Sequence, residues 1–267
     1  MADCDNNCSS CGVEGCASRQ GIQKDKMSDL SNVKKIIGVV SGKGGVGKSL
    51  VTSLLAVNKL HEGKKVAILD ADVTGPSIPQ CFGVHGQLEG DGKYIYPLLS
   101  KGGVEIVSTN LLLEDETDPI IWRGPIIAGM VKQFYTEVAY GDVDYMFVDM
   151  PPGTGDVPLT VFQSMNIDGI VIVTTPQDLV SMIVSKAIKM AEKMNIKVLG
   201  IVENMSYVVC PDCGKHINVF GNSKLEEVAK KYNLKILGRI PIDQKLATAC
   251  DEGKIEDIND NYFDLDF

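Results

Sequence analysis

One glycine-rich segment near the start of the chain limits the possible folds more than any other feature. Residues 42–49 match the pattern G-x-x-x-x-G-K-[ST] and read Gly42-Lys43-Gly44-Gly45-Val46-Gly47-Lys48-Ser49. An apolar run at residues 36–40 precedes them, and apolar side chains at helical spacing follow over residues 50–60. The segment is therefore predicted to join a strand to a helix, which is the setting that a phosphate-binding loop requires.

Each residue type in this loop has a physical reason. Glycines let the backbone curl so that successive N–H groups point at phosphate oxygens, and the N-terminus of the following helix adds partial positive charge. Lys48 supplies a full positive charge, and the Ser49 hydroxyl is a candidate Mg²⁺ ligand. We therefore expect ATP and Mg²⁺ here. The alternative is a glycine-rich turn that binds no ligand.

Short β-branched runs recur along the chain and are separated mostly by helical patterns. The runs lie at residues 65–69, 104–108, 145–148, 170–174, 198–202 and 236–240. The helical patterns lie at residues 126–139, 179–194, 223–232 and 243–250. Strands that are apolar on both faces and alternate with helices predict a doubly wound α/β fold, with a mostly parallel sheet covered by helices on both sides.

The chain ends differ in composition from this central part. Residues 1–30 are rich in Asp, Asn, Ser, Gly and Cys and have few large apolar side chains, so we expect a flexible, cysteine-rich tail. Residues 31–256 are predicted to form one P-loop ATPase domain. Residues 257–267 are acidic with scattered aromatic residues, and we expect a loosely held tail.

Charge argues against a nucleic-acid partner, and hydropathy argues against a membrane. The formal net charge is -9 over 267 residues, whereas nucleic-acid binding depends on clustered Lys and Arg. No stretch approaches the roughly 20 apolar residues that span a bilayer, and the start lacks a signal-peptide pattern. We therefore expect a soluble, cytoplasmic protein that binds neither nucleic acid nor membrane.

Two aspartates follow predicted strands and complete a nucleotidase site. Asp149 closes the run at residues 145–148, where a Walker-B carboxylate orients the Mg²⁺ shell, and Asp72 follows the run at residues 65–69. The turn at residues 151–156 is a candidate switch loop that responds to the γ-phosphate. Aspartates at strand ends also serve as ordinary helix caps, which is the alternative for each one alone.

The loop contains a lysine, Lys43, in addition to Lys48, and this residue indicates a family. A lysine just after the first glycine marks the deviant Walker A ATPases, and further motifs in order make the chain resemble the Mrp/ApbC iron–sulfur carrier ATPases over about residues 34–253. These motifs are Asp70-Ala71-Asp72-Val73-Thr74-Gly75-Pro76-Ser77-Ile78-Pro79, Trp122-Arg123-Gly124-Pro125, Asp149-Met150-Pro151-Pro152-Gly153-Thr154-Gly155-Asp156 and Glu203-Asn204-Met205-Ser206.

The resemblance implies an ATP-dependent homodimer with slow hydrolysis. It implies that Lys43 reaches the phosphates bound by the partner subunit, that Asp72 positions the attacking water, and that Asp149 is the switch II aspartate. It also implies that Asn204 hydrogen-bonds adenine while the backbone near Pro241 closes over the ring. Trp122 and Arg123 match a family motif to which we assign no chemistry.

A C-x-x-C pair, Cys210 and Cys213, is the leading candidate for a metal site. The pair supplies two thiolates where Zn²⁺ or a [4Fe–4S] cluster usually takes four ligands. A two-fold dimer would bring the same pair from each subunit together, and in the family the matching cysteines are thought to hold a bridging [4Fe–4S] cluster that passes to apo-proteins. The alternatives are zinc, completed by His216, and a redox dithiol.

The remaining cysteines fall into two groups. Cys4, Cys8, Cys11 and Cys16 offer enough ligands for a second cluster or for zinc, or they are loose thiols in a disordered tail. Eukaryotic relatives carry a cluster in a cysteine-rich extension, but their cysteine spacing differs from this one. Cys81 and Cys250 stand alone in the sequence and are expected to be buried small hydrophobic residues.

Three other function classes remain open. A spatial-organising ATPase of the MinD or ParA kind shares the Lys43 signature, although it needs a basic patch or a basic amphipathic helix. A reductase that resembles the nitrogenase iron protein would use a bridging cluster to donate electrons. A regulatory ATPase stabilised by zinc would carry no cluster.

Overall fold

The computed structural model describes residues 24–72, 75, 77–112, 124–153, 155–177 and 180–267. Its centre is an eight-stranded sheet with the order β12-β9-β8-β1-β7-β2-β6-β5. Neighbouring strands are parallel except for β5, which pairs antiparallel with β6 at one edge. The expected doubly wound, mostly parallel α/β sheet is confirmed.

All the strands expected from apolar runs are present in this sheet. They are β1 (Ser31–Ser41), β2 (Val66–Asp70), β6 (Glu105–Ser108), β7 (Gly141–Asp149), β8 (Gly169–Thr174), β9 (Val198–Glu203) and β12 (Ile236–Arg239). The central strand β1 begins five positions before the apolar run, because its first three residues pair with residues 141–143 of β7.

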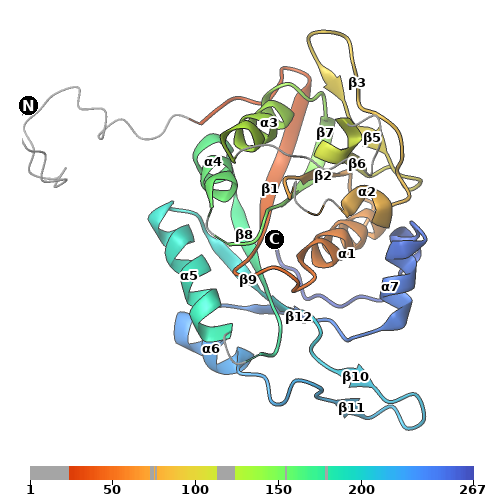
Figure 1. The fold of residues 1–267 in the computed structure, drawn as a ribbon, viewed down its shortest axis with the longest axis vertical. Coiled ribbons are helices and arrows are strands. Elements are labelled where there is room, and N and C mark those ends of the chain that lie inside the picture. Colours follow the sequence, from red (N-terminus) through yellow and green to blue (C-terminus); the bar gives the residue numbers. More distant parts are fainter. Residues whose placement is uncertain (1–23, 73–74, 76, 113–123, 154, 178–179) are drawn as a thin grey trace, which may run out of the picture.

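Helices cover both faces of the sheet (Figure 1). One face carries α3 (Gly124–Thr136), α4 (Asp156–Ser164), α5 (Val180–Lys193) and α6 (Leu225–Tyr232), and the other carries α1 (Lys48–His61), α2 (Ile78–Cys81) and α7 (Gln244–Asp251). Side chains that alternate along the central strands, such as Ile36 and Ile37, enter opposite hydrophobic cores. No helix in the described ranges is long and apolar enough to cross a membrane.

Several short elements escaped the sequence patterns. α2 spans four residues, and α4 starts at the last residue of the expected switch loop. Two small antiparallel hairpins lie outside the main sheet: β3 (Glu89–Gly90) with β4 (Ile95–Tyr96), and β10 (Val208–Val209) with β11 (His216–Ile217). Strand β5 spans Leu98–Leu99. Elements this short carry no detectable periodicity.

The C-terminal segment corrects our expectation of a loosely held tail. Phe263 is buried, and it forms an antiparallel bridge with Gly238 of the edge strand β12. The Asp264 N–H donates to the Leu237 carbonyl at 2.8 Å, and the Tyr145 hydroxyl donates to the carbonyl of Phe267 at 3.0 Å. The segment packs because it covers the otherwise open edge of the sheet.

The N-terminal boundary also shifts. The Asp25 N–H donates to the Ser164 carbonyl at 2.8 Å, and the buried Ser28 hydroxyl donates to the Val138 carbonyl at 2.7 Å. We expected the folded domain to begin at residue 31, but packing against it begins earlier. The cysteines at positions 4, 8, 11 and 16 lie outside the described residues.

Candidate functional site

The glycine-rich loop connects β1 to α1 at the carboxyl edge of the sheet. Gly45 and Gly47 have φ angles of 75° and 74°, in the left-handed region that favours glycine. Helix α1 begins at Lys48 and has no side-chain cap, so the N–H groups of its first turn are available to an anion. The loop thus has the backbone form of a phosphate site.

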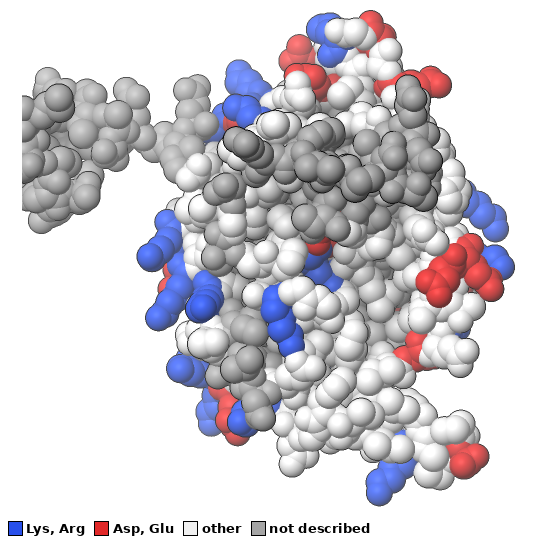
Figure 2. Space-filling model, in the orientation of Figure 1, with Lys and Arg blue, Asp and Glu red and all other residues white. Residues whose placement is uncertain are grey.

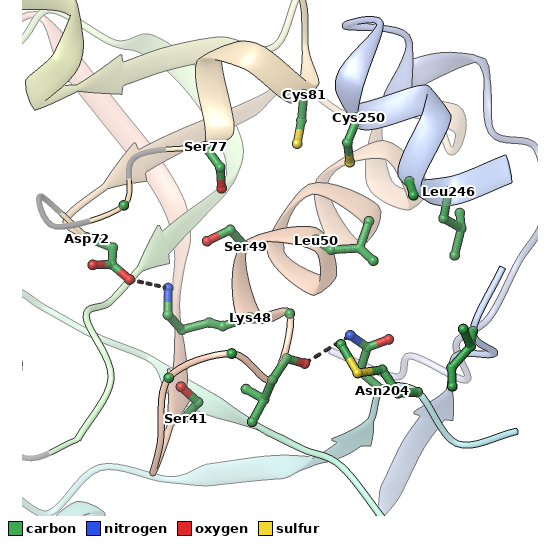
Figure 3. Close-up of a pocket in the computed structure, with 18 of the residues that line it drawn as sticks. Ser41, Lys48, Ser49, Leu50, Asp72, Ser77, Cys81, Asn204, Leu246 and Cys250 are labelled. Atoms are coloured by element: carbon green, nitrogen blue, oxygen red, sulfur yellow. Dashed lines mark hydrogen bonds and ion pairs between the residues drawn. The ribbon is translucent and has the colours of Figure 1, made fainter. Parts of the chain in front are cut away.

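A buried group of charges lies directly beneath this loop. The Lys48 ammonium is 2.7 Å from Oδ2 of Asp149. It is also 3.3 Å from Oδ2 of Asp72, and Figure 3 shows this second ion pair. Burial acts to lower the pKa of Lys48, but the charges of Asp149 and Asp72 outweigh it and raise the pKa above its ordinary value. Lys48 therefore stays positively charged although it is almost fully buried.

Two hydroxyls of α1 complete the surroundings of Asp149. Ser49 donates to Oδ2 and Thr52 donates to Oδ1, each at 2.6 Å, and Asp149 has no exposed surface. Carboxylate and hydroxyl oxygens are hard ligands of the kind that Mg²⁺ prefers. Ser49 and Asp149 therefore fit a Mg²⁺ site beside the phosphate loop.

Asp70 is a third aspartate of this group, and the sequence analysis gave it no role. It lies opposite Asp149 in the pairing of β2 with β7. Burial, and then the charge of Asp149, raise the pKa of Asp70 well above its ordinary value. Its carboxyl accepts from the Asp72 N–H at 3.1 Å and from the Ser108 hydroxyl at 3.0 Å, so it positions the backbone that carries Asp72. Only the strand register reveals this role.

Asn204 follows β9 and joins the loop from a distant part of the sequence. Its side-chain N–H donates to the Val46 carbonyl at 2.9 Å, and its backbone N–H donates to the Thr174 carbonyl at 2.8 Å. A Cβ atom placed on Gly47 would lie 2.2 Å from Nδ2 of Asn204. Asn204 therefore holds the loop through a contact that only glycine at position 47 permits.

These parts line one cavity of about 530 Å³, a size typical of small-molecule sites. Residues 43–50 of the loop form one wall, with Asp72, Asn204 and Pro152 beside them. Pro241 and the start of α7 form the opposite wall. The cavity thus brings the expected phosphate residues together with Asn204 and Pro241, the two expected to contact adenine.

The Lys43 side chain contacts a residue outside the phosphate loop. Its ammonium donates to Oε1 of Gln177, which follows β8, while its carbonyl accepts from the Ser41 hydroxyl at 3.0 Å. Gly42, the first residue of the loop, precedes it directly after β1. Lys43 is only half-buried, so its side chain is not enclosed in the way that Lys48 is.

The C-x-x-C pair occupies the turn between β10 and β11. The Cys210 N–H donates to the Lys215 carbonyl, and the Gly214 N–H donates to the Cys210 carbonyl, both at 2.9 Å. Backbone N–H groups, of Cys213 first and then of Asp212, lower the pKa of Cys210 by hydrogen bonding to its sulfur. Cys213 is exposed. The turn presents thiolate character at the surface, as a metal-binding pair requires.

The third ligand considered for zinc is engaged otherwise. His216 stacks on Tyr207, with ring centroids 4.0 Å apart and an interplanar angle of 11°. Within the part of the chain that the structure describes, no group of three or more His, Cys, Asp or Glu side chains could hold a metal ion. Cys210 and Cys213 therefore form a two-ligand site within one described chain.

Hydrogen bonds connect this hairpin to the wall of the cavity. Asn204 lies six residues before Cys210. Between them, the Ser206 N–H donates to the Ile240 carbonyl at 2.9 Å, and the Tyr207 carbonyl accepts from the Ile242 N–H at 2.8 Å. The segment that enters the hairpin is thus bonded to both sides of Pro241.

Cys81 and Cys250, which stand alone in the sequence, come together in the fold. Cys81 ends α2 and is buried, Cys250 lies in α7 and is half-buried, and both line the cavity. Figure 3 shows the two side chains side by side, with both sulfur atoms directed toward the cavity. Their proximity depends on the packing of two helices far apart in sequence, which no local pattern indicates.

Some expected functional residues lie outside the described residues. These are Trp122 and Arg123, Val73, Thr74 and Pro76 after Asp72, Thr154 of the expected switch loop, and the amino-terminal cysteines.

Comparisons with known proteins agree with this geometry. The family model of the NUBPL iron-transfer P-loop NTPases, of the ParA group, matches residues 32–263. The chain is 44% identical over 267 residues to an iron–sulfur cluster carrier protein of Clostridium perfringens, covering 96% of this chain and 93% of the relative.

Solved structures give the same placement. A nucleotide-binding protein of Archaeoglobus fulgidus, in complex with ADP, has a TM-score of 0.76 and 46% sequence identity, and the match covers 84% of this chain and 88% of that one. The septum site-determining protein MinD of Pyrococcus horikoshii, complexed with Mg-ADP, has a TM-score of 0.54 and 22% identity over 82% of this chain and 86% of its own. This second likeness concerns the fold alone.

The two left-handed glycines provide a matched test of the loop. Gly47→Ala meets both backbone strain and the Asn204 side chain, whereas Gly45→Ala meets strain but no atom within 4 Å. We expect Gly45→Ala to lower the free energy of unfolding by about 1–2 kcal/mol and Gly47→Ala to lower it by more, as measured by calorimetry. Adding Asn204→Ala to Gly47→Ala should recover part of the lost stability, because the clash with the Asn204 side chain is removed. Equal effects of the two glycine variants would contradict the Asn204 contact.

Proposed function

Because the chain belongs to the family of NUBPL-type iron-transfer P-loop NTPases, we propose that it is an ATP-dependent carrier of iron–sulfur clusters. A homodimer holds a [4Fe–4S] cluster between the Cys210 and Cys213 pairs of its two subunits and passes it to apo-proteins. The cluster is cargo rather than a resident cofactor. The observation that carries the proposal is the hydrogen-bonded connection between the nucleotide cavity and the cysteine hairpin.

In this proposal, ATP takes over the contacts that the carboxylates now make with Lys48. The backbone N–H groups of residues 42–49 bind the phosphates, and Lys48 pairs with them. Ser49 and Asp149 would hold Mg²⁺, which would neutralise charge on the phosphates, and Asp72 would position the water that attacks the γ-phosphate. Positioning and charge stabilisation supply most of the rate in phosphoryl transfer. The slow hydrolysis that the family resemblance implies is part of this proposal.

The base of the nucleotide fits the opposite end of the cavity. Asn204 donates one side-chain N–H to Val46, and the second amide N–H and the carbonyl oxygen remain as candidate groups for the polar edge of adenine. Pro241 and Leu246 offer apolar surface to the ring from the facing wall. This arrangement supports adenine recognition by Asn204 and Pro241.

An apolar surface around the hairpin supports the dimer. Five large hydrophobic side chains are 39–55% exposed near the two cysteines: Val209, Ile217, Val219, Phe220 and Ile242. Figure 2 shows a mostly uncharged surface in this region, with charges at the tip of the hairpin. A second copy of the same surface would cover these side chains and supply the two missing ligands in one step.

The nucleotide can control the cluster through the segment at residues 204–207. This segment contacts the phosphate loop through Asn204 and the strand after β12 through Ser206 and Tyr207. A change at the γ-phosphate that shifts the loop therefore reaches the cysteines within a few residues. We place the carrier in the cytosol, where thiols remain reduced.

Anaerobic reconstitution tests the proposal. Wild type and Cys210→Ala/Cys213→Ala are treated with iron and sulfide, and iron, zinc, sulfide and the visible spectrum are measured per dimer. We expect the double variant to lose about one four-iron cluster per dimer, while ADP binding persists because neither cysteine lines the cavity. Iron that remains in the variant belongs to Cys4, Cys8, Cys11 and Cys16. Binding of zinc alone, or of no metal, by the wild type would contradict the cluster proposal.

A mixing experiment tests the role of Lys43 across the dimer. Lys43→Ala and Asp72→Ala are each expected to lose ATP hydrolysis. In a mixed dimer, the Lys43→Ala subunit keeps its own Asp72 and receives the intact Lys43 of the other chain. Random mixing should therefore restore about a quarter of the wild-type activity, since half of the dimers each gain one complete site. No recovery would mean that Lys43 acts within its own subunit.

A further inference from the structure

A pair of thiols lies in the wall of the nucleotide cavity and has no part in the proposed cluster site. Cys81 ends α2, Cys250 lies in the last turn of α7, and both are free cysteines that line the cavity. Their side chains lie side by side in Figure 3, with both sulfur atoms directed toward the cavity.

Two glycines bring the helices close enough for this contact. Gly83 follows α2 and Gly253 follows α7, with φ angles of 63° and 67°. A Cβ atom on Gly253 would lie 2.5 Å from the Cα of Gly83, so the two backbones touch. The side chain of Gln80 also donates to the Asp251 carbonyl at 3.5 Å. Backbone packing between the two helices therefore keeps the thiols near each other.

The two thiols differ in reactivity in a way that suits an ordered reaction. The hydrogen bond from Cys81 lowers the pKa of Cys250, which favours its thiolate. The same hydrogen bond, and then burial, raise the pKa of Cys81. Cys250 is half-buried, whereas Cys81 is 5% exposed. Cys250 is thus the accessible nucleophile, and Cys81 is the protected thiol beside it.

We propose that Cys81 and Cys250 form a reversible disulfide that weakens nucleotide binding. A peroxide is the oxidant. The Cys250 thiolate attacks one peroxide oxygen, the O–O bond breaks, and hydroxide leaves, which gives a sulfenic acid. The sulfur of Cys81 then attacks the Cys250 sulfur, the S–O bond breaks, and the Cys81 proton leaves with the hydroxyl as water. The peroxide gains the two electrons that the sulfurs lose, and a dithiol reductant reverses the step.

The disulfide would act on both walls of the cavity. Helix α2 follows the segment that leaves Asp72, and α7 follows Pro241. A sulfur–sulfur bond of about 2 Å is much shorter than a non-bonded contact between two thiols. Because the two backbones already touch at Gly83 and Gly253, its formation would turn or shift the two helices that line the cavity and then fix them to each other.

Binding linkage gives a second, reciprocal consequence. If the disulfide weakens nucleotide binding by some factor, bound nucleotide must make the disulfide harder to form by the same factor. Bound nucleotide also covers Cys250 from the cavity side. A cell under peroxide stress would therefore oxidise the nucleotide-free carrier first.

The test uses the full chain, purified under reducing conditions and not loaded with iron or sulfide. Graded hydrogen peroxide is followed by peptide mapping by mass spectrometry and by calorimetric titration of ADP. We expect a peptide pair linked through Cys81 and Cys250, and ADP affinity about tenfold weaker in the oxidised form, as when about a tenth of the molecules remain competent to bind. Reduction should restore the affinity, and saturating ADP should slow the linkage.

Matched variants separate this pair from the other cysteines. The ratio of reduced to oxidised ADP affinity should fall to one in Cys250→Ser and in Cys81→Ala, and it should persist in Cys210→Ser/Cys213→Ser. Absence of the Cys81–Cys250 link in folded protein, or a link that leaves ADP affinity unchanged, would overturn the proposal. Neither result bears on cluster binding, which the reconstitution experiment tests by itself.

Discussion

The buried ion pair between Lys48 and Asp149 is the interaction on which the site depends. Neither side chain has much access to water, so each charge relies on the other for stabilisation. Removing one partner of such a pair typically costs about 3–5 kcal/mol, because the remaining charge is left uncompensated. Asp72 also pairs with Lys48, and the Ser49 and Thr52 hydroxyls donate hydrogen bonds to Asp149. The cation is thus held ready in a position where the phosphates of a nucleotide can replace the carboxylates.

The topology of the sheet makes this arrangement possible. Strand β1 lies between β7 and β8, and all three run in the same direction, so their carboxyl ends meet at one edge. The phosphate loop leaves that edge from β1, Asp149 closes β7, and Asp70 closes β2. Strand β9 brings Asn204 to the same place. A doubly wound sheet therefore gathers residues separated by more than a hundred positions into one cavity.

Features that depend on neighbouring residues in the chain could be predicted from the sequence. The loop at residues 42–49, the apolar strands and the longer helices follow from spacing and residue type alone. Asp70, the contact of Cys81 with Cys250, and the docking of Phe263 did not follow, because each depends on register or packing between distant segments. The four-residue helix α2 is too short for a periodic pattern. The aromatic residues of the segment at residues 257–267 were visible in the sequence, but no local pattern showed that Phe263 would be buried beside β12.

In the proposed function, the nucleotide controls the cysteine hairpin through the segment at residues 204–207. The most direct test is the rate at which an iron chelator removes iron from the loaded protein in the presence of ADP and of a non-hydrolysable ATP analogue. We expect clearly different rates for the two nucleotides, and a smaller difference in Asn204→Ala, where the hydrogen bond to Val46 is lost. Identical rates in loaded protein that binds both nucleotides would contradict this coupling.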